Sequence, residues 1–374
     1  MATNAKNIAE LLNTDTTVKV GDIEDGSVTT AKLADNAVTS AKALNLGRRN
    51  LVINGGMQLA QRATSSTGLG AASGYFTLDR FNMSINAASA GRYTMSQSAV
   101  TDLEGFSNAL KIECTTADTS IASGEALILQ HRLEGQDLQR LKSTSTTTKA
   151  FTISFYAKSN ASRAISLEAR FSNGTNRQAA TLHTIGTSWA RYTMTVPASS
   201  SMQIDNDNSN EMQINFFLHA GSDFTSGTIQ GSTLGAADNT KRASGIGSIF
   251  SSTSNTLEIT GVQMEVSSAA TEFEHRSFGE ELSLCRRYYQ INYSSWYGVA
   301  AATGYFVSDS ISYVPPMRAN PAVAQTSFSS GSGGRFTSTG ATSQTIQGAS
   351  IYSSPTSAGG NSGYSATWSA DAEL

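Results

Sequence analysis

Short segments with alternating apolar and polar side chains run through the middle of this chain, from about residue 76 to residue 266. The clearest are 151–158, 164–171, 191–196, 212–218 and 257–264, and further ones lie at 92–95, 110–112 and 127–133. A period of two puts one set of side chains on each face of a β-strand, so that one face packs inward and the other meets water. The pattern therefore predicts a single antiparallel jelly roll or β-sandwich.

The composition excludes several classes of protein. Only 15% of the 374 residues are charged, and the net charge of −3 argues against a general nucleic-acid-binding protein, because phosphate binding needs a basic face. No segment reaches the ~18 apolar residues of a membrane-spanning helix. The first residues, MATNAKNIAE, lack the basic-then-apolar pattern of a secretory signal. We expect no membrane insertion, and synthesis in the cytoplasm without a signal peptide.

Cysteine and acidic residues give little indication of a metal or redox site. Cys114 and Cys285 are too few for a disulfide framework, and we expect both to be buried thiols. The loop 205–208 carries alternating oxygen ligands that suit Ca²⁺, but it lacks the Gly and Glu of an EF-hand loop, which favours a solvated turn. We expect no cofactor, although a structural Ca²⁺ ion is compatible with this loop.

The N-terminal 48 residues combine a short helix with a repeat. Ile8, Leu11 and Leu12 fall on one face of a helix that is too short to be stable alone, so we expect it to attach to another protein. The segment 25–33, DGSVTTAKL, is echoed ten positions later by DNAVTSAKA at 35–43. One copy cannot bury enough surface to offset its ordering entropy, and such repeats pack on neighbouring copies or chains. A homo-oligomeric stalk is predicted, with a flexible linker as the alternative.

These repeats, and the string RNLVINGGMQLAQR at 49–62, resemble the N-terminal parts of bacteriophage tail fibre proteins. The strands that follow are similar to the carbohydrate-binding jelly rolls often joined to glycosidases and phage fibres. The resemblance implies a homotrimer that is attached through its N-terminus to a phage tail or baseplate protein and is located in the virion.

A helix is predicted at 277–290, after the sandwich of 49–276. Ser277 and Glu280 form a capping box, the acidic residues lie in the first turn and Arg286 and Arg287 lie late, as the helix dipole prefers. Phe278, Leu282, Cys285 and Tyr289 form an apolar stripe that we expect to pack at a domain or subunit junction.

The same region carries the second resemblance to tail fibre proteins. The string ATEFEHRSFGEELSLCRRYYQ at 270–290 is similar to a segment found in fibres of many double-stranded-DNA phages, with Glu272 where those proteins usually have proline. The stretch VPPMRANP at 314–321 also resembles the family.

The last segment, 291–374, joins aromatic residues to long Ser, Gly and Thr runs, and it is predicted to be a small β-rich tip that binds a receptor. Aromatic rings stack on the apolar faces of sugars, and small polar side chains hydrogen-bond their hydroxyls. The alternative is that most of these rings fill a core. Our candidates for glycan binding are Tyr293, Trp296, Tyr297, Tyr364 and Trp368.

Catalytic motifs are absent: the chain has no G-x-S-x-G elbow, no H-E-x-x-H pair and no phosphate-binding loop. We therefore predict a non-enzymatic phage tail fibre that binds host surface polysaccharide or lipopolysaccharide through trimeric tip sites. Two alternatives stay open, a structural connector that carries another adhesin and, less favoured, a fibre-borne polysaccharide hydrolase.

Overall fold

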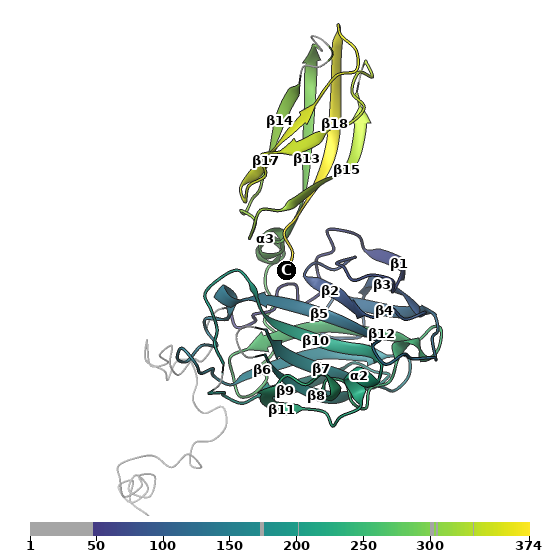
Figure 1. The fold of residues 1–374 in the computed structure, drawn as a ribbon, viewed down its shortest axis with the longest axis vertical. Coiled ribbons are helices and arrows are strands. Elements are labelled where there is room, and N and C mark those ends of the chain that lie inside the picture. The colour runs from purple at the N-terminus through teal and green to yellow at the C-terminus, as the bar shows by residue number, and fades with distance from the viewer. Residues whose placement is uncertain (1–47, 173–175, 201, 300–302, 304–305, 332) are drawn as a thin grey trace, which may run out of the picture. The chain divides into compact units, whose positions relative to one another are not determined.

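The computed structural model describes residues 48–374 except 173–175, 201, 300–302, 304–305 and 332. Residues from Asn50 to Leu374 form one compact unit, to which the following description applies. Most of its regular structure is antiparallel strand, in two larger and two smaller sheets (Figure 1).

The two larger sheets form a sandwich. In spatial order, the first contains β1 (Ser65–Leu69), β3 (Arg92–Ala99), β4 (Asn108–Thr116), β12 (Thr256–Glu265), β6 (Phe151–Ser159) and β9 (Ala190–Val196). The second contains β11 (Gly231–Ala236), β8 (Arg177–Ile185), β7 (Arg163–Phe171), β10 (Asn210–Ala220), β5 (Ala126–Glu134) and β2 (Phe81–Asn86). The predicted mostly-β, jelly-roll-like sandwich is confirmed, and all eight segments expected from the alternation are strands.

The sandwich core comes from the inward-facing set of each strand. On β6, Phe151, Ile153 and Phe155 are fully buried, while Tyr156 and Lys158 on the other face are partly exposed. Phe216 of β10 meets Phe155 from the opposite sheet with ring centroids 5.0 Å apart. Alternation of this kind is what makes one face of each sheet apolar.

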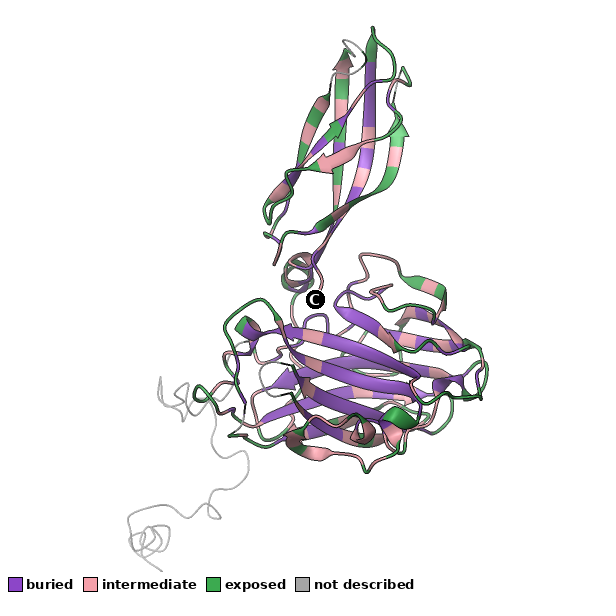
Figure 2. Ribbon diagram, viewed as in Figure 1, coloured by how far each residue is buried: buried purple, intermediate pink, exposed green. Residues whose placement is uncertain are grey.

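Two neighbouring strands of the second sheet, β5 and β10, are buried along both faces (Figure 2). Phe224 of α2 (Ser222–Thr225) and Ala243, which follows the 3₁₀ turn η4 (Asn239–Lys241), pack on apolar residues of their outer face, and a buried ion pair lies on the neighbouring β7. Arg242 donates to both carboxylate oxygens of the fully buried Glu168, at 2.8 and 2.9 Å, and Asn215 donates to the same carboxylate at 2.7 Å. A charge buried in this way needs such partners to be tolerated.

Two further 3₁₀ turns, η3 (Gly135–Leu138) and η5 (Ile249–Ser251), adjoin the sandwich, and α3 (Phe278–Arg286) follows it. The predicted cap is present, because the Ser277 hydroxyl accepts a hydrogen bond from the Glu280 amide at 3.3 Å. The helix is shorter than the predicted 277–290, since the chain enters the next strand at Tyr289.

The stripe of α3 packs against the chain except at its first residue. Cys285 is fully buried in a cluster with Ile53 and Leu59, and Leu282 packs against it. Tyr289 is 7% exposed, beneath the Arg62 guanidinium, which lies 3.7 Å from the ring centroid. Phe278 is 59% exposed, because the cluster contacts only the later turns of the helix. It does not pack at a junction within this chain, and its packing at a subunit junction stays a prediction.

The remaining strands form two three-stranded sheets. The third sheet has the order β13 (Tyr289–Val299), β18 (Asn361–Asp371), β15 (Ala322–Ser330), and the fourth has the order β14 (Val307–Ser312), β17 (Gly348–Ser353), β16 (Gly340–Thr342). Their shared core is small: Ile311, Tyr313, Met317, Ala349, Ile351, Ala366, Trp368, Ala370 and Ala372.

Buried ion pairs join these strands to the sandwich. Glu134, at the end of β5, is fully buried and accepts hydrogen bonds from Arg287 (2.8 and 3.0 Å) and Arg318 (3.1 Å). Glu373, just after β18, pairs with the buried Arg80. Both ends of the C-terminal β-region are thus held by charge-assisted hydrogen bonds, which are stronger than neutral ones.

Candidate functional site

An aromatic pair lies on the outer face of the fourth sheet. Phe306, which immediately precedes β14, is 70% exposed, and Tyr352 of β17 is 37% exposed. Their ring centroids are 5.5 Å apart with the ring planes at 84°, an edge-to-face contact. Gly340 lies opposite Tyr352 in the register, and a Cβ there would lie 2.5 Å from the ring, so only glycine allows the ring this close. The backbone of β16 therefore supports the Tyr352 ring as a plate.

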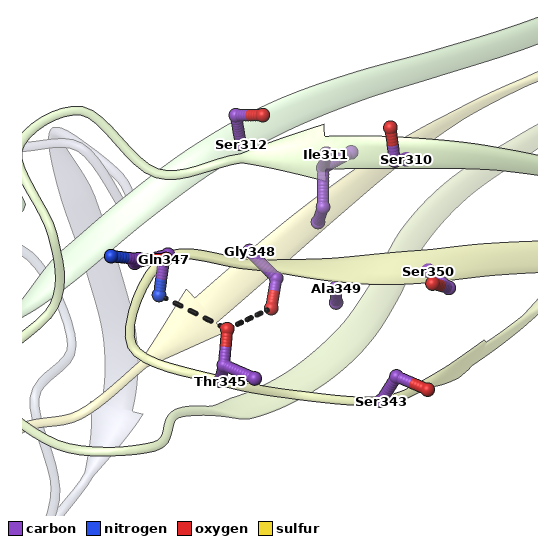
Figure 3. Close-up of a pocket in the computed structure, with 9 residues that line it drawn as sticks. All are labelled: Ser310, Ile311, Ser312, Ser343, Thr345, Gln347, Gly348, Ala349 and Ser350. Atoms are coloured by element: carbon purple, nitrogen blue, oxygen red, sulfur yellow. Dashed lines mark hydrogen bonds between the residues drawn. The ribbon is translucent and has the colours of Figure 1, made fainter.

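A shallow hollow of ≈ 240 Å³ adjoins this pair on the same sheet (Figure 3). It is lined by Ser310, Ile311, Ser312, Ser343, Thr345, Gln347, Gly348, Ala349 and Ser350. Ser350 is two residues from Tyr352 along β17, so the hollow begins about 7 Å from the aromatic plate. Strand pairing places Ser310 opposite Ser350, which brings hydroxyls from two strands to one spot.

The turn beside the hollow is held by the Thr345 side chain, as the dashed lines in Figure 3 show. The Thr345 hydroxyl donates to the Gly348 carbonyl at 3.2 Å and accepts from the Gln347 amide at 3.2 Å. Within the part of the chain that the structure describes, the hydroxyls of Ser310, Ser312, Ser343 and Ser350 make no hydrogen bond to protein. They are therefore available to a ligand, on a turn that is already ordered.

No charged side chain lines the hollow, and charges are few in the surrounding segment. Residues 291–374 contain five charged side chains: Asp309, Arg318, Arg335, Asp371 and Glu373. Each has partners within the chain; Asp309, for example, accepts from the Ser295 amide at 3.2 Å, and Asp371 pairs with Arg62 at 3.0 Å. Since no titratable group lines the hollow, it offers neither an acid–base pair nor a charge for an anion, but it does offer stacking and hydroxyl hydrogen bonding.

The five predicted glycan residues divide between the two faces of the third sheet. Tyr293 and Tyr297 on β13 point outward and are 65% and 66% exposed. Trp296, Tyr364 and Trp368 occupy the inner face: the Trp368 Nε1 donates to the Ser294 hydroxyl at 2.9 Å, and Trp296 and Tyr364 both pack on Phe336.

The expected exposure of Trp368 and Tyr364 is therefore wrong. They are 2% and 3% exposed, and burial raises the pKa of Tyr364 to about 12. A ring buried in this way cannot stack on a sugar. The alternative considered from the sequence, that such rings fill a small core, holds for these two residues.

Some predictions fall on residues that are not described. Ile8, Leu11 and Leu12 and the repeats at 25–43 lie outside the described residues, so the attachment segment and stalk stay predictions. Both cysteines are free and buried, as expected. Among the described residues, no cluster of three or more His, Cys, Asp and Glu is suited to hold a metal ion. In the same part of the chain, no helix is long and apolar enough to cross a membrane.

A Ser–His–Glu chain is present in the sandwich. The His219 Nδ1 lies 2.7 Å from the Ser248 hydroxyl, and its Nε2 lies 3.1 Å from the Glu125 carboxylate. His219 is fully buried, and the Ser248 oxygen already accepts from the Phe250 amide at 3.0 Å as the cap of η5. This arrangement gives both ring nitrogens of a buried histidine a hydrogen-bond partner.

Phe306 and Tyr352 belong to the aromatic set of 291–374, but neither they nor the serines of the hollow are among the five glycan candidates from the sequence. What brings these residues together is the pairing of β14 and β16 with β17. The order of residues in the sequence does not show which strands pair or in which register. The alternation of Ser308, Ser310 and Ser312 was the available signal, since it marks a strand with a hydroxyl-bearing face.

No family model and no curated protein match the chain. Among solved structures, it is similar to the enzymatically active domain of tailspike protein 4 from bacteriophage CBA120, with 12% identity and a TM-score of 0.29 over 58% of this chain and 21% of that one. It is also similar to a putative sugar-binding protein from Bacteroides thetaiotaomicron (11% identity, TM-score 0.29, 59% of this chain and 100% of that one).

A third similar structure is the carbohydrate-binding module TmCBM61 in complex with β-1,4-galactotriose, with 9% identity and a TM-score of 0.28 over 59% of this chain and 100% of that one. At these identities and TM-scores the similarities carry no argument about function. The described chain belongs to the class of two-sheet β-sandwich proteins, extended by a smaller β-region with few charges.

Proposed function

We propose that this chain is a non-enzymatic fibre protein of a phage tail that binds a neutral surface polysaccharide at the outer face of its fourth sheet. The observation that carries the proposal is the exposed pair of Phe306 and Tyr352 beside a hydroxyl-lined hollow. A sugar ring stacks on the Tyr352 plate, and a neighbouring sugar places its hydroxyls among Ser310, Ser350 and Thr345.

The chemistry of the face favours a neutral polysaccharide over an anionic one. No charged side chain lines the hollow; of the five charged residues in 291–374, Arg318, Asp371 and Glu373 are in ion pairs, and Asp309 and Arg335 are hydrogen-bonded within the chain. Stacking and neutral hydrogen bonds are little affected by salt, unlike contacts between exposed charges. Binding that persists at high ionic strength is therefore part of the proposal.

The phage setting is supported by the sequence resemblance of the repeats at 25–43 and of the segments at 49–62 and 270–290. On that resemblance we place the protein in the virion as a homotrimer, attached by its N-terminal segment to a tail or baseplate protein. Several weak sites on one fibre would then bind together with an affinity far above that of one site.

Affinity electrophoresis of the full-length protein in gels that contain a glucan, a galactan or a mannan tests the proposal, with an anionic polysaccharide in a parallel gel. We expect retardation by at least one neutral polymer, unchanged by 0.5 M salt. Tyr352→Ala should weaken it about tenfold, the equivalent of about 1.4 kcal/mol for a lost stacking partner.

Leu182→Ala, which removes a 40% exposed apolar side chain from β8 of the sandwich, is the matched control and should be retarded like the parent. If no neutral polymer retards the protein, the structural connector becomes the better interpretation. If Tyr352→Ala is retarded as strongly as the parent, the site lies elsewhere.

A further inference from the structure

The outer face of β13 is an apolar stripe that nothing in the described chain covers. Ile291, Tyr293, Tyr297 and Val299 are 38%, 65%, 66% and 62% exposed, at every second position except Ser295. Gly363, opposite Tyr297 on β18, leaves room for that ring, since a Cβ at residue 363 would lie 3.0 Å from it. The stripe therefore lies beside a flat part of the same face, called the floor below, that is formed by the small side chains of β18.

That floor is formed by the small polar side chains of β18. The register pairs Ile291 with Ser369, Tyr293 with Thr367, Ser295 with Ser365 and Val299 with Asn361. β15 continues it with Ala324, Ser327 and Ser329. The face carries no charge except Asp371 at its end, which is paired with Arg62.

The apolar core shared by the third and fourth sheets is small and contains few large side chains. Four of the nine buried residues in the shared core of the third and fourth sheets are alanines, at 349, 366, 370 and 372. Small domains with too little core usually gain stability by association. β13 is also an edge strand of eleven residues without charge or proline, the kind of edge that proteins normally cover.

The composition of the stripe favours a second copy of this chain over a sugar. Ile291 and Val299 are branched aliphatic side chains, which pack against other side chains but offer no aromatic face for stacking on a sugar. A neutral face can meet its own copy without like-charge repulsion, which would otherwise cost several kcal/mol.

We propose that the outer face of the third sheet packs against the same region of a neighbouring copy of this chain, with Tyr293 and Tyr297 at the centre of the contact. This inference concerns assembly and does not rest on glycan binding by the fourth sheet. A face three strands wide (about 14 Å) and about nine residues long (about 30 Å) has an area of about 400 Å² per chain, roughly half of what each partner buries in a stable two-chain interface. Such a contact suits copies that are also joined elsewhere, as the N-terminal repeats predict.

Thiol labelling of the purified full-length protein tests the contact without any sugar present. Ser295→Cys places a thiol in the middle of the stripe, and Ser308→Cys places the comparison thiol at another exposed strand position, on the outer face of the fourth sheet. The background is low because Cys114 and Cys285 are buried. We expect a maleimide to label residue 295 at least tenfold more slowly than residue 308, and light scattering to give a mass of more than one chain.

Adding Tyr293→Ser and Tyr297→Ser to the Ser295→Cys protein should bring its labelling rate within threefold of the Ser308→Cys rate. Equal rates in the two single variants overturn the proposal, because the face is then open to solvent. Protection that survives the two tyrosine substitutions also overturns it, because the thiol is then covered by its own chain. Neither result bears on retardation by polysaccharide, which is measured separately.

Discussion

Asp79 is a carboxylate with almost no exposed surface, placed where the 50–62 segment meets the sandwich. Its oxygens accept from the Gln61 amide at 3.1 Å and from the Gln61 side chain at 2.7 Å, and Arg62 lies 3.9 Å away. Burial dominates over these contacts and raises the pKa of Asp79 from 3.8 to about 6. The residue therefore makes folding depend on pH.

The sign follows from proton linkage. Between about pH 4 and pH 6 the folded chain holds a proton on Asp79 that the unfolded chain has lost, so the free energy of unfolding falls as pH rises. Asp79→Asn removes this dependence. The stability of the variant relative to the parent should rise by about 2 kcal/mol from pH 4 to pH 7, the part of the effect of a two-unit pKa shift that falls in this range. Urea unfolding across this range measures it, and a difference that is constant with pH would contradict the assignment.

His131 shows why the comparison with a variant is needed. It is buried, and its Nε2 lies 3.2 Å from the Ile53 amide nitrogen and 3.1 Å from the Ile53 carbonyl oxygen. Burial holds the pKa of His131 well below its ordinary value, so its contribution to stability is lost as pH falls below about 6.5. The two groups oppose each other in the parent protein, and only the difference between parent and variant isolates Asp79.

Among the elements, the strands of the sandwich follow from the sequence and those of the C-terminal region do so only in part. β6 places large apolar side chains at every second position from Phe151 to Phe155, and β12 does so at Leu257 and Ile259 and again, after a register shift, at Val262 and Met264. On β18 the inward set includes Ala366, Trp368 and Ala370, and the outward set includes Ser365 and Thr367. Small residues on both faces weaken the contrast on which alternation depends.

The sequence indicates the chemistry of the candidate site, but it does not indicate which residues form the site. The aromatic and hydroxyl-rich composition of 291–374 indicates stacking surfaces, yet each ring's face depends on the strand register. Trp368 and Tyr293 lie on adjacent strands of the same sheet, and one is buried while the other is exposed. Gly340 gives room for the Tyr352 ring, and Ser310 lines the hollow beside it. Both are distant from Tyr352 in the sequence and come close to it only through strand pairing.

Trp368 should therefore act through stability and not through ligand contact. Trp368→Ala removes a large buried ring together with the hydrogen bond to Ser294, and we expect a loss of about 3–5 kcal/mol. Thr367→Ala, the adjacent residue on the opposite face of β18, should cost less than about 1 kcal/mol. Thermal unfolding followed by circular dichroism compares them, and equal small losses would mean that the ring is not part of the core.

Across the whole molecule, the described chain separates its charges from its candidate contact surfaces. Ion pairs concentrate where the C-terminal strands meet the sandwich, at Glu134, Arg80 and Glu373. The outer faces of the third and fourth sheets are almost uncharged. We infer that the face of the third sheet contacts a neighbouring copy and that the face of the fourth sheet binds a neutral polysaccharide. Because the two faces are separate, assembly and binding can occur at the same time.

Hydrogen exchange of the full-length protein, with and without the polysaccharide that retards it most, tests this account most directly. We expect the added protection to fall on peptides covering 306–312 and 340–353, the strands and turn around Tyr352 and the hollow. Protection on the sandwich sheets, or on β13 and β18, would contradict the assignment of the polysaccharide to the fourth sheet.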